Sequence, residues 1–379
     1  MRRAFQLTDL QSSFIDSSIY IAYFLMAIPA GSFMQRFGYK KGILLGLSFF
    51  AIGAFLFIPA ASTQMYVFFL GALFVLACGL AFLETAANPY VTVLGPKETA
   101  PNRLNFSQSF NGLAAFLAPI IGGKYILTET ELSDSQIQAL PVAEMQEFLT
   151  QEANSVKGPY LVLGSLIVVV AIIFAFTKLP EIEEEGETKS TIAQAWRHRH
   201  LRWAVVAQFF YIGAQICVLS FLIRFIMESA DLTAKSAAIY SGFAGLAFMI
   251  GRFAGTFFMR FVKPHKLLQI YAVASMILTL IAILTQGNII IYSLLGVAFF
   301  MSIMFPTIFS LGLADLGKDT KIASSLIVMS IVGGAALPPV LGYVSDLTNN
   351  IQYGYFVPFI CFFVVFLFAV KGWKPVKEL

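Results

Sequence analysis

The chain has 379 residues, of which 58% are hydrophobic and only 12% are charged. Soluble domains are about 45–50% apolar and about 25% charged, so this composition excludes an ordinary soluble protein. The formal net charge of +4 is small, and its distribution along the chain indicates membrane orientation and no nucleic-acid partner.

Apolar stretches of about 20 residues recur from end to end, and each is long enough to cross a hydrocarbon core about 30 Å thick. They are continuously apolar instead of alternating at every second residue, which predicts helices and not barrel strands. We therefore predict an all-α transmembrane fold with eleven spans, at about 13–34, 42–60, 66–94, 104–127, 159–177, 202–228, 235–258, 266–285, 288–313, 322–345 and 352–371.

Basic residues gather in alternate loops, as Arg36, Lys40 and Arg260 do, whereas residues 128–157 between two spans are mainly acidic. Loops rich in Lys and Arg stay in the cytoplasm. This asymmetry predicts a multi-pass protein of the plasma membrane, of the bacterial inner-membrane type, that is surrounded by lipid. We expect it to be a monomer.

The three cysteines, Cys78, Cys217 and Cys361, lie inside predicted spans without the spacing of a metal site, which is typical of small packing residues. We expect no metal and no cofactor. The chain contains no phosphate-binding G-x4-G-K-[ST] motif and no channel-type filter, which disfavours an ATP-driven pump and a channel. No catalytic pair is visible, so an enzyme is not predicted.

Weak internal repeats divide the chain into two halves. Residues 30–37 resemble 254–261, Pro89 with Leu94-Gly95 resembles Pro306 with Leu311-Gly312, and Pro119 resembles Pro339, at offsets of 224, 217 and 220. Duplicated halves are common in carriers. We predict an N-terminal bundle of five helices over 1–177, a cytoplasmic linker over 178–201 and a C-terminal bundle of six helices over 202–379.

The repeat also predicts a missing helix. The counterpart of the span 202–228 would lie at about −22 to 4, before Met1. Either the protein has lost this helix or the sequence starts at an internal methionine, and we expect the second.

Glu84 is expected to be the one ionisable group deep in the bilayer, where a charge costs about 2.5–3.5 kcal/mol and usually serves function. It is either a protonated packing residue or a carboxyl that takes up and releases a proton. Asn88 lies one helical turn further, and Gln108 and Asn111 share a face of the next span. Amides of this kind, with Gln215 in the second half, suit either a neutral polyhydroxylated ligand or hydrogen bonding between helices.

The stretches Phe82–Gly95 (FLETAANPYVTVLG), Arg103–Asn111 (RLNFSQSFN) and Phe210–Phe225 (FYIGAQICVLSFLIRF) carry a family resemblance. The chain resembles the major facilitator superfamily, in its fucose/glucose/galactose permease branch, and is most similar to L-fucose:proton symporters. The resemblance implies twelve helices in two bundles, alternating access and proton symport, with eleven of the helices present here.

The family's functional glutamate, glutamine and asparagine fall on Glu84, Gln108 and Asn111. The resemblance thus implies proton coupling by Glu84 and sugar binding by Glu84, Gln108 and Asn111. Asn88 and Gln215 join the set of predicted sugar ligands. The basic residues Arg36, Lys40 and Arg260 are expected to belong to cytoplasmic gating loops.

The chain also departs from the family. It lacks the aspartate of the family's first helix, and it has Leu219 in place of a tryptophan and Met304-Phe305 in place of Gln-Tyr. The changes at Leu219 and Met304-Phe305 remove a stacking ring and two polar groups, which weakens the case for L-fucose itself. The predicted function is secondary active, proton-coupled symport of L-fucose or a related monosaccharide. The alternatives are a sugar-binding or sensing membrane protein that does not transport, or an incomplete gene product.

Overall fold

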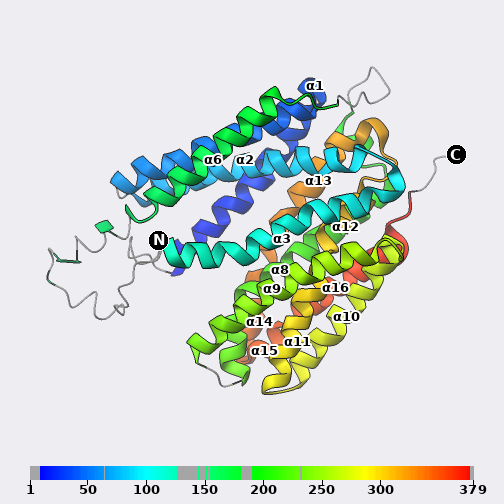
Figure 1. Ribbon diagram of the computed structural model, residues 1–379. Helices are drawn as coiled ribbons and strands as arrows, with labels where there is room; N and C mark the ends of the chain where they lie inside the picture. The colour runs from blue at the N-terminus through cyan, green and yellow to red at the C-terminus, as the bar shows by residue number, and fades with distance from the viewer. Residues whose placement is uncertain are drawn as a thin grey trace. The chain divides into compact units, whose positions relative to one another are not determined.

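The computed structural model describes residues 9–63, 65–125, 141, 144–145, 150–151, 154–180, 190–230 and 233–375. All regular structure in these ranges is helical (Figure 1). The helices are α1 (Asp9–Thr63), α2 (Tyr66–Val93), α3 (Ala100–Tyr125), α6 (Lys157–Phe176), α7 (Ile192–Ala195), α8 (Arg199–Ala230), α9 (Ala234–Phe258), α10 (Pro264–Leu284), α11 (Asn288–Met301), α12 (Met304–Gly312), α13 (Thr320–Met329), α14 (Gly333–Thr348), α15 (Ile351–Gly354) and α16 (Phe356–Leu367).

The predicted all-α fold with eleven spans is confirmed. The first two spans form α1, which bends at Gly38 with φ 83° and ψ 169°, a left-handed conformation that glycine adopts without a steric penalty. The spans 288–313 and 322–345 are both broken. The first is interrupted at Ser302–Ile303 between α11 and α12, and the second contains a 3-10 turn at Ser330–Val332 between α13 and α14.

Nine helical stretches of the described chain are long and apolar enough to cross a membrane, and one of them, Ser18–Thr63, contains two predicted spans. The helix α3 covers the predicted span 104–127 and is not one of the nine. Its Asn102, Asn105, Gln108 and Asn111 lower its mean hydropathy. So many polar side chains in one membrane helix indicate that α3 has a functional role besides crossing the membrane.

Contacts divide the chain into two compact units. Unit 1 comprises Met1–Ala86 and Ala118–Glu181, and unit 2 comprises Ala87–Leu117 and Ile182–Leu379. The predicted halves, 1–177 and 202–379, were inferred from internal repeats of the sequence. The two units are defined by contacts instead, so the division into halves stays a prediction.

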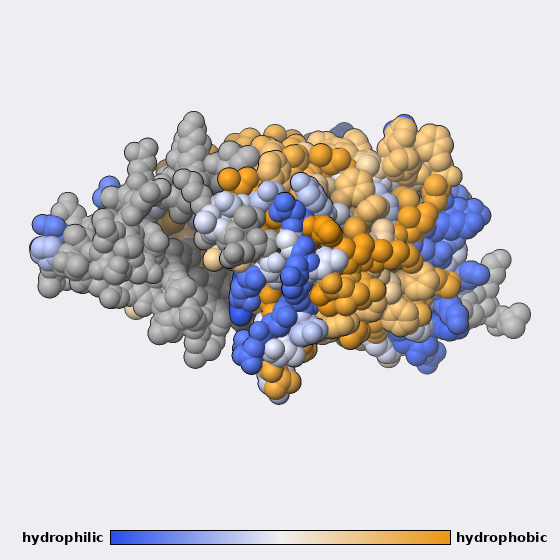
Figure 2. Space-filling view, turned by 90° about the horizontal axis from the view of Figure 1, so that it is seen from below, coloured by the Kyte–Doolittle hydropathy of each residue, from blue (hydrophilic) through white to orange (hydrophobic). Residues whose placement is uncertain are grey.

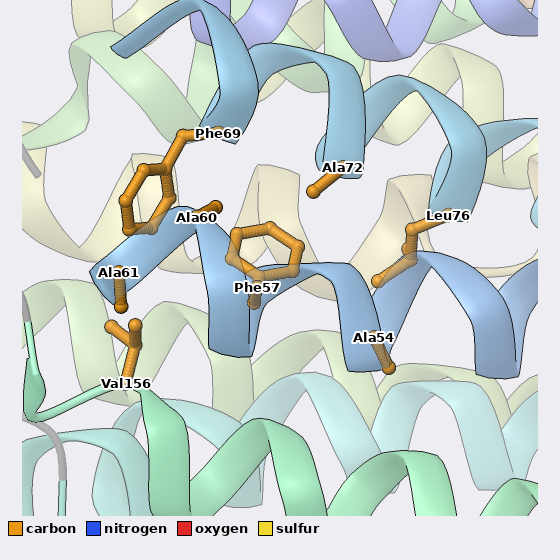
Figure 3. Close-up of a cluster of buried hydrophobic side chains, with 8 residues drawn as sticks. All are labelled: Ala54, Phe57, Ala60, Ala61, Phe69, Ala72, Leu76 and Val156. Carbon is orange, nitrogen blue, oxygen red and sulfur yellow. The ribbon is translucent and has the colours of Figure 1, made fainter. Parts of the chain in front are cut away.

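The core of unit 1 forms where α1, α2 and the residues before α6 pack together. Phe57 of α1 lies between Phe69 of α2, at a ring distance of 5.6 Å, and Tyr160 of α6, stacked at 3.9 Å. Figure 3 shows Phe57 and Phe69 beside the small side chains of Ala60 and Ala72. These alanines let the helices approach closely, which is how membrane helices gain packing energy without a hydrophobic driving force.

Unit 2 is built around α8, which packs against α12, α14 and α16. Tyr355, fully buried, lies 4.2 Å from the Phe225 ring of α8. Cys217 and Cys361 are buried and unpaired, as is Cys78 in unit 1, in agreement with a packing role. The face drawn in Figure 2 shows an apolar band between two hydrophilic zones, as expected for helices whose middle faces lipid.

Candidate functional site

Two of the predicted sugar ligands meet in unit 2. The Nε2 atom of Gln108 on α3 donates a hydrogen bond of 2.9 Å to Oδ1 of Asn88 on α2. Asn88 is 6% exposed and Gln108 is half-buried. The bond fixes the orientation of both amides. An amide side chain carries both donors and an acceptor, the groups that a polar ligand needs.

Arg103 holds α3 against the end of α2. Its guanidinium donates to the carbonyl oxygens of Val91 at 3.3 Å, of Thr92 at 2.8 Å and of Pro96 at 2.8 Å, and also to the hydroxyl of Thr99. The last carbonyls of α2 have no partner within the helix itself. One arginine side chain therefore satisfies the end of α2 and sets the position from which Gln108 reaches Asn88.

The other predicted ligands are Asn111, Gln215 and Glu84. Asn111 lies three residues after Gln108 on α3 and is exposed, while Gln215 on α8 is half-buried and takes no part in the Asn88–Gln108 bond. Glu84 belongs to unit 1, is half-buried and lies one turn before Asn88 on α2. The roles of these residues in binding and proton coupling stay predictions.

Arg252 is a buried charge that the sequence reasoning missed. It lies within α9 and is 3% exposed. Its Nε donates to the carbonyl oxygen of Ser302 at 2.7 Å, its Nη1 donates to the carbonyl oxygen of Gln108 at 2.8 Å, and its guanidinium lies 4.6 Å from the ring centre of Phe248. Besides Glu84, the predicted spans therefore contain a buried ionisable group, Arg252, and its position within the predicted span 235–258 was the available signal.

Arg252 acts at the break between α11 and α12. The carbonyl of Ser302 lies in that break, where the helical hydrogen-bond ladder is interrupted. The preceding residue, Gly251, lies so close that a Cβ atom there would stand 2.2 Å from the carbonyl oxygen of Phe299. Gly251 permits the close approach and Arg252 satisfies the freed carbonyl, so this pair stabilises a discontinuous membrane helix.

Further polar contacts attach residues 97–105 to the C-terminal helices within unit 2. Asn102 Nδ2 donates to the carbonyl oxygen of Thr256 at 2.8 Å, and Asn105 Nδ2 donates to Oγ1 of Thr307 at 3.1 Å. Lys97 pairs with Asp315 at 2.8 Å. The hydrogen bond to the Asp315 carboxylate raises the pKa of Lys97.

The three predicted gating residues differ in their surroundings. Lys40 donates to the carbonyl oxygens of Ala175 at 2.9 Å and Thr177 at 2.8 Å, at the end of α6. Arg36 lies 5.1 Å from the ring centre of Phe37, and Arg260 is exposed. Their part in gating stays a prediction.

Gln208 and Tyr211 of α8 are both fully buried. Neither amide atom of Gln208 has a hydrogen-bond partner in the described part of the chain.

Comparisons with known proteins agree with the fold. Residues 1–321 match the Major Facilitator Superfamily. The L-fucose-proton symporter of Escherichia coli K12 is 41% identical over 377 residues, which cover 97% of this chain and 86% of that protein. The glucose/galactose transporter of Brucella abortus is 39% identical over 99% of this chain and 88% of that protein.

A crystal structure of the fucose symporter from the same superfamily, in the outward conformation, superposes with a TM-score of 0.91 at 40% identity. The match covers 98% of this chain and 92% of that one. The helical bundle, the buried polar groups and these matches define a secondary transporter. The chain belongs to the major facilitator superfamily, and it is a multi-pass membrane protein of the bacterial inner-membrane type.

Proposed function

We propose that this transporter carries L-fucose or a closely related monosaccharide together with a proton, by alternating access. The relatives that are 41% and 39% identical bear the names L-fucose-proton symporter and glucose/galactose transporter, so both 6-deoxyhexoses and hexoses belong to the substrate class to be tested.

The observation that carries the proposal is the Asn88–Gln108 amide pair with exposed Asn111 three residues further on the same helix. A sugar needs several donors and acceptors in fixed positions, and amides supply both kinds. The pair is already oriented by its own hydrogen bond, which lowers the entropy lost when a sugar binds.

Glu84 is the proposed proton carrier. It is half-buried on α2, one turn from Asn88, so protonation there can influence the amides to which a sugar binds. A carboxyl in a span that opens alternately to each side can take up a proton on one side and release it on the other.

The test uses the purified chain in proteoliposomes with an imposed pH gradient, acid outside. Labelled L-fucose, galactose and glucose are offered separately. The preferred sugar should accumulate above its external concentration, and a protonophore should abolish this accumulation. Equal uptake with and without the gradient would exclude proton symport.

The same vesicles distinguish the alternative of a sensor. A protein that binds sugar without transporting it would retain labelled sugar in an equilibrium binding assay and yet show no counterflow. A monomer is expected, and light scattering of the detergent-solubilised protein would test this.

A further inference from the structure

One face of the first two turns of α8 borders a groove at the basic side of the membrane. Arg199, Arg202, Trp203 and Val206 line this groove, which has a volume of about 420 Å³. Their spacing of three, four and seven residues places all four on one side of the helix. The volume falls within the range of small-molecule sites.

Neither arginine in the groove has a hydrogen bond or ion pair from its side chain to any described residue. Arginines elsewhere do have partners, such as Arg224 with Glu228 at 2.6 Å and Arg252 with two carbonyls. The first turn of α8 also contains no acidic residue. Two cations at the positive end of a helix dipole are unfavourable by themselves, and an anion bound beside them would offset this cost.

The groove changes in polarity along its length. Trp203 is half-buried and lies against the end of the C-terminal helix, because a Cβ atom on Gly372 would stand 2.9 Å from its Cβ and Cγ atoms. Val206, 42% exposed, follows one turn deeper into the span. The lining therefore passes from two guanidinium groups through an indole to an aliphatic side chain. Exposed Lys371, next to Gly372, adds a further positive charge at this end of the helices.

We propose that this groove binds an anionic phospholipid of the cytoplasmic leaflet. Arg199 and Arg202 bind the phosphate, Trp203 lies at the level of the glycerol backbone and Val206 contacts the first part of an acyl chain. A basic site at the cytoplasmic end of membrane helices is suited to anionic headgroups. A free phosphate ion would use the two arginines and gain nothing from Trp203 and Val206, which favours the lipid as the occupant.

The chain has three tryptophans, so a Trp196→Phe/Trp373→Phe variant reports on Trp203 alone. Its fluorescence in detergent is titrated with brominated phosphatidylglycerol and, separately, with brominated phosphatidylcholine. The anionic lipid should quench Trp203 at a much lower mole fraction. Each basic residue contributes about fivefold to the affinity for an anionic surface, so Arg199→Gln/Arg202→Gln should weaken the preference about thirtyfold.

Arg197→Gln is the matched control, since Arg197 is exposed, lies two residues before the groove and does not line it. It should weaken the preference by no more than about fivefold, against about thirtyfold for the double substitution. Equal quenching by the two lipids in the unsubstituted groove would overturn the proposal without relying on any arginine variant. A preference that survives the double substitution, or that millimolar inorganic phosphate abolishes, would also overturn it.

Discussion

Lys40 stabilises the end of a helix distant in sequence. Its ammonium group donates to two carbonyls at the end of α6, which no residue of that helix can satisfy. A cation at the negative end of a helix dipole adds a favourable electrostatic interaction. The residue expected from sequence to gate the pathway thus has a clear structural task within unit 1.

We predict that Lys40→Gln lowers the free energy of unfolding by about 1 kcal/mol, because two charge-assisted hydrogen bonds are lost from a site that water also reaches. Thermal unfolding of the detergent-solubilised protein measures the change. Lys41→Gln is the control, since Lys41 is exposed and lies 5.8 Å from the Phe37 ring centre without a carbonyl partner in the described chain. Equal effects of the two substitutions would show that only the net charge of the loop matters.

Glu84→Gln tests proton coupling at a single atom. The substitution keeps the size of the side chain and mimics the protonated form, so accumulation driven by a pH gradient should fall to background while exchange of sugar at equal concentrations persists. Uptake and exchange in proteoliposomes measure the two separately.

Glu228→Gln is the matched control for Glu84→Gln, because Glu228 is exposed and pairs with Arg224 at the end of its span. It should accumulate sugar normally. Normal accumulation by Glu84→Gln as well would show that Glu84 is a packing residue, the alternative that the sequence leaves open.

At the scale of elements, the backbone of α9 lies close against the break between α11 and α12. Gly251→Ala would place a Cβ atom 2.2 Å from the carbonyl oxygen of Phe299, and a backbone atom cannot move aside as a side chain can. We predict a loss of about 3 kcal/mol in the free energy of unfolding, at the upper end for overpacking, and loss of uptake.

Gly242→Ala in the same helix is the control, because a Cβ atom there meets nothing within 4 Å. Alanine in a helix is favoured over glycine by about 0.5–1 kcal/mol, so this variant should be as stable as the parent or slightly more stable. Melting temperatures and uptake of the two variants are compared side by side. An unchanged Gly251→Ala protein would mean that the two helices are further apart than the structure places them.

The sequence predicts the helices well and their interruptions poorly. Continuous hydropathy identifies a span such as 288–313, because crossing lipid requires about 20 apolar residues regardless of neighbours. The local signal for the break at Ser302–Ile303 is Pro306, which has no N–H to donate to the carbonyl four residues earlier, that of Ser302. The donor that satisfies this carbonyl is Arg252, a contact across 50 residues that no local pattern contains.

For the candidate site as well, the sequence predicts which residues take part but not how they contact one another. Helical spacing predicted that Gln108 and Asn111 share a face, and the family resemblance selected them, but the bond from Gln108 to Asn88 depends on how Arg103 joins α2 to α3. Arg252 was visible as a charge inside a predicted span. Its acceptors are main-chain carbonyls, which have no sequence signature, so its role could be found only from the structure.

At the scale of the whole molecule, α3 and the loop before it are bound to the C-terminal helices by a series of polar contacts inside unit 2. The Lys97–Asp315 ion pair joins two basic-side loops 218 residues apart. If a sugar passes between the halves 1–177 and 202–379, alternating access requires that such contacts open on one side in each cycle.

Joining positions 97 and 315 covalently should therefore stop transport. In a Lys97→Cys/Asp315→Cys protein, a flexible bis-methanethiosulfonate reagent, which joins the two thiols through disulfide bonds, should reduce sugar exchange to background, and a reductant that cleaves these bonds should restore it. Each single-cysteine variant, treated in the same way, should remain active, because the native cysteines are buried. Full exchange by the cross-linked protein would show that these loops move together throughout the cycle.

The bond from Arg252 to Gln108 ends on a main-chain oxygen, and this has an evolutionary consequence. Every amino acid offers the same carbonyl, so mutation of the side chain at position 108 leaves this tie between helices intact. Selection can then change the side chain at position 108, which is proposed to bind the sugar, without breaking the hydrogen bond from Arg252. A protein built in this way can change its sugar preference by single substitutions while the connection between α9 and α3 is kept.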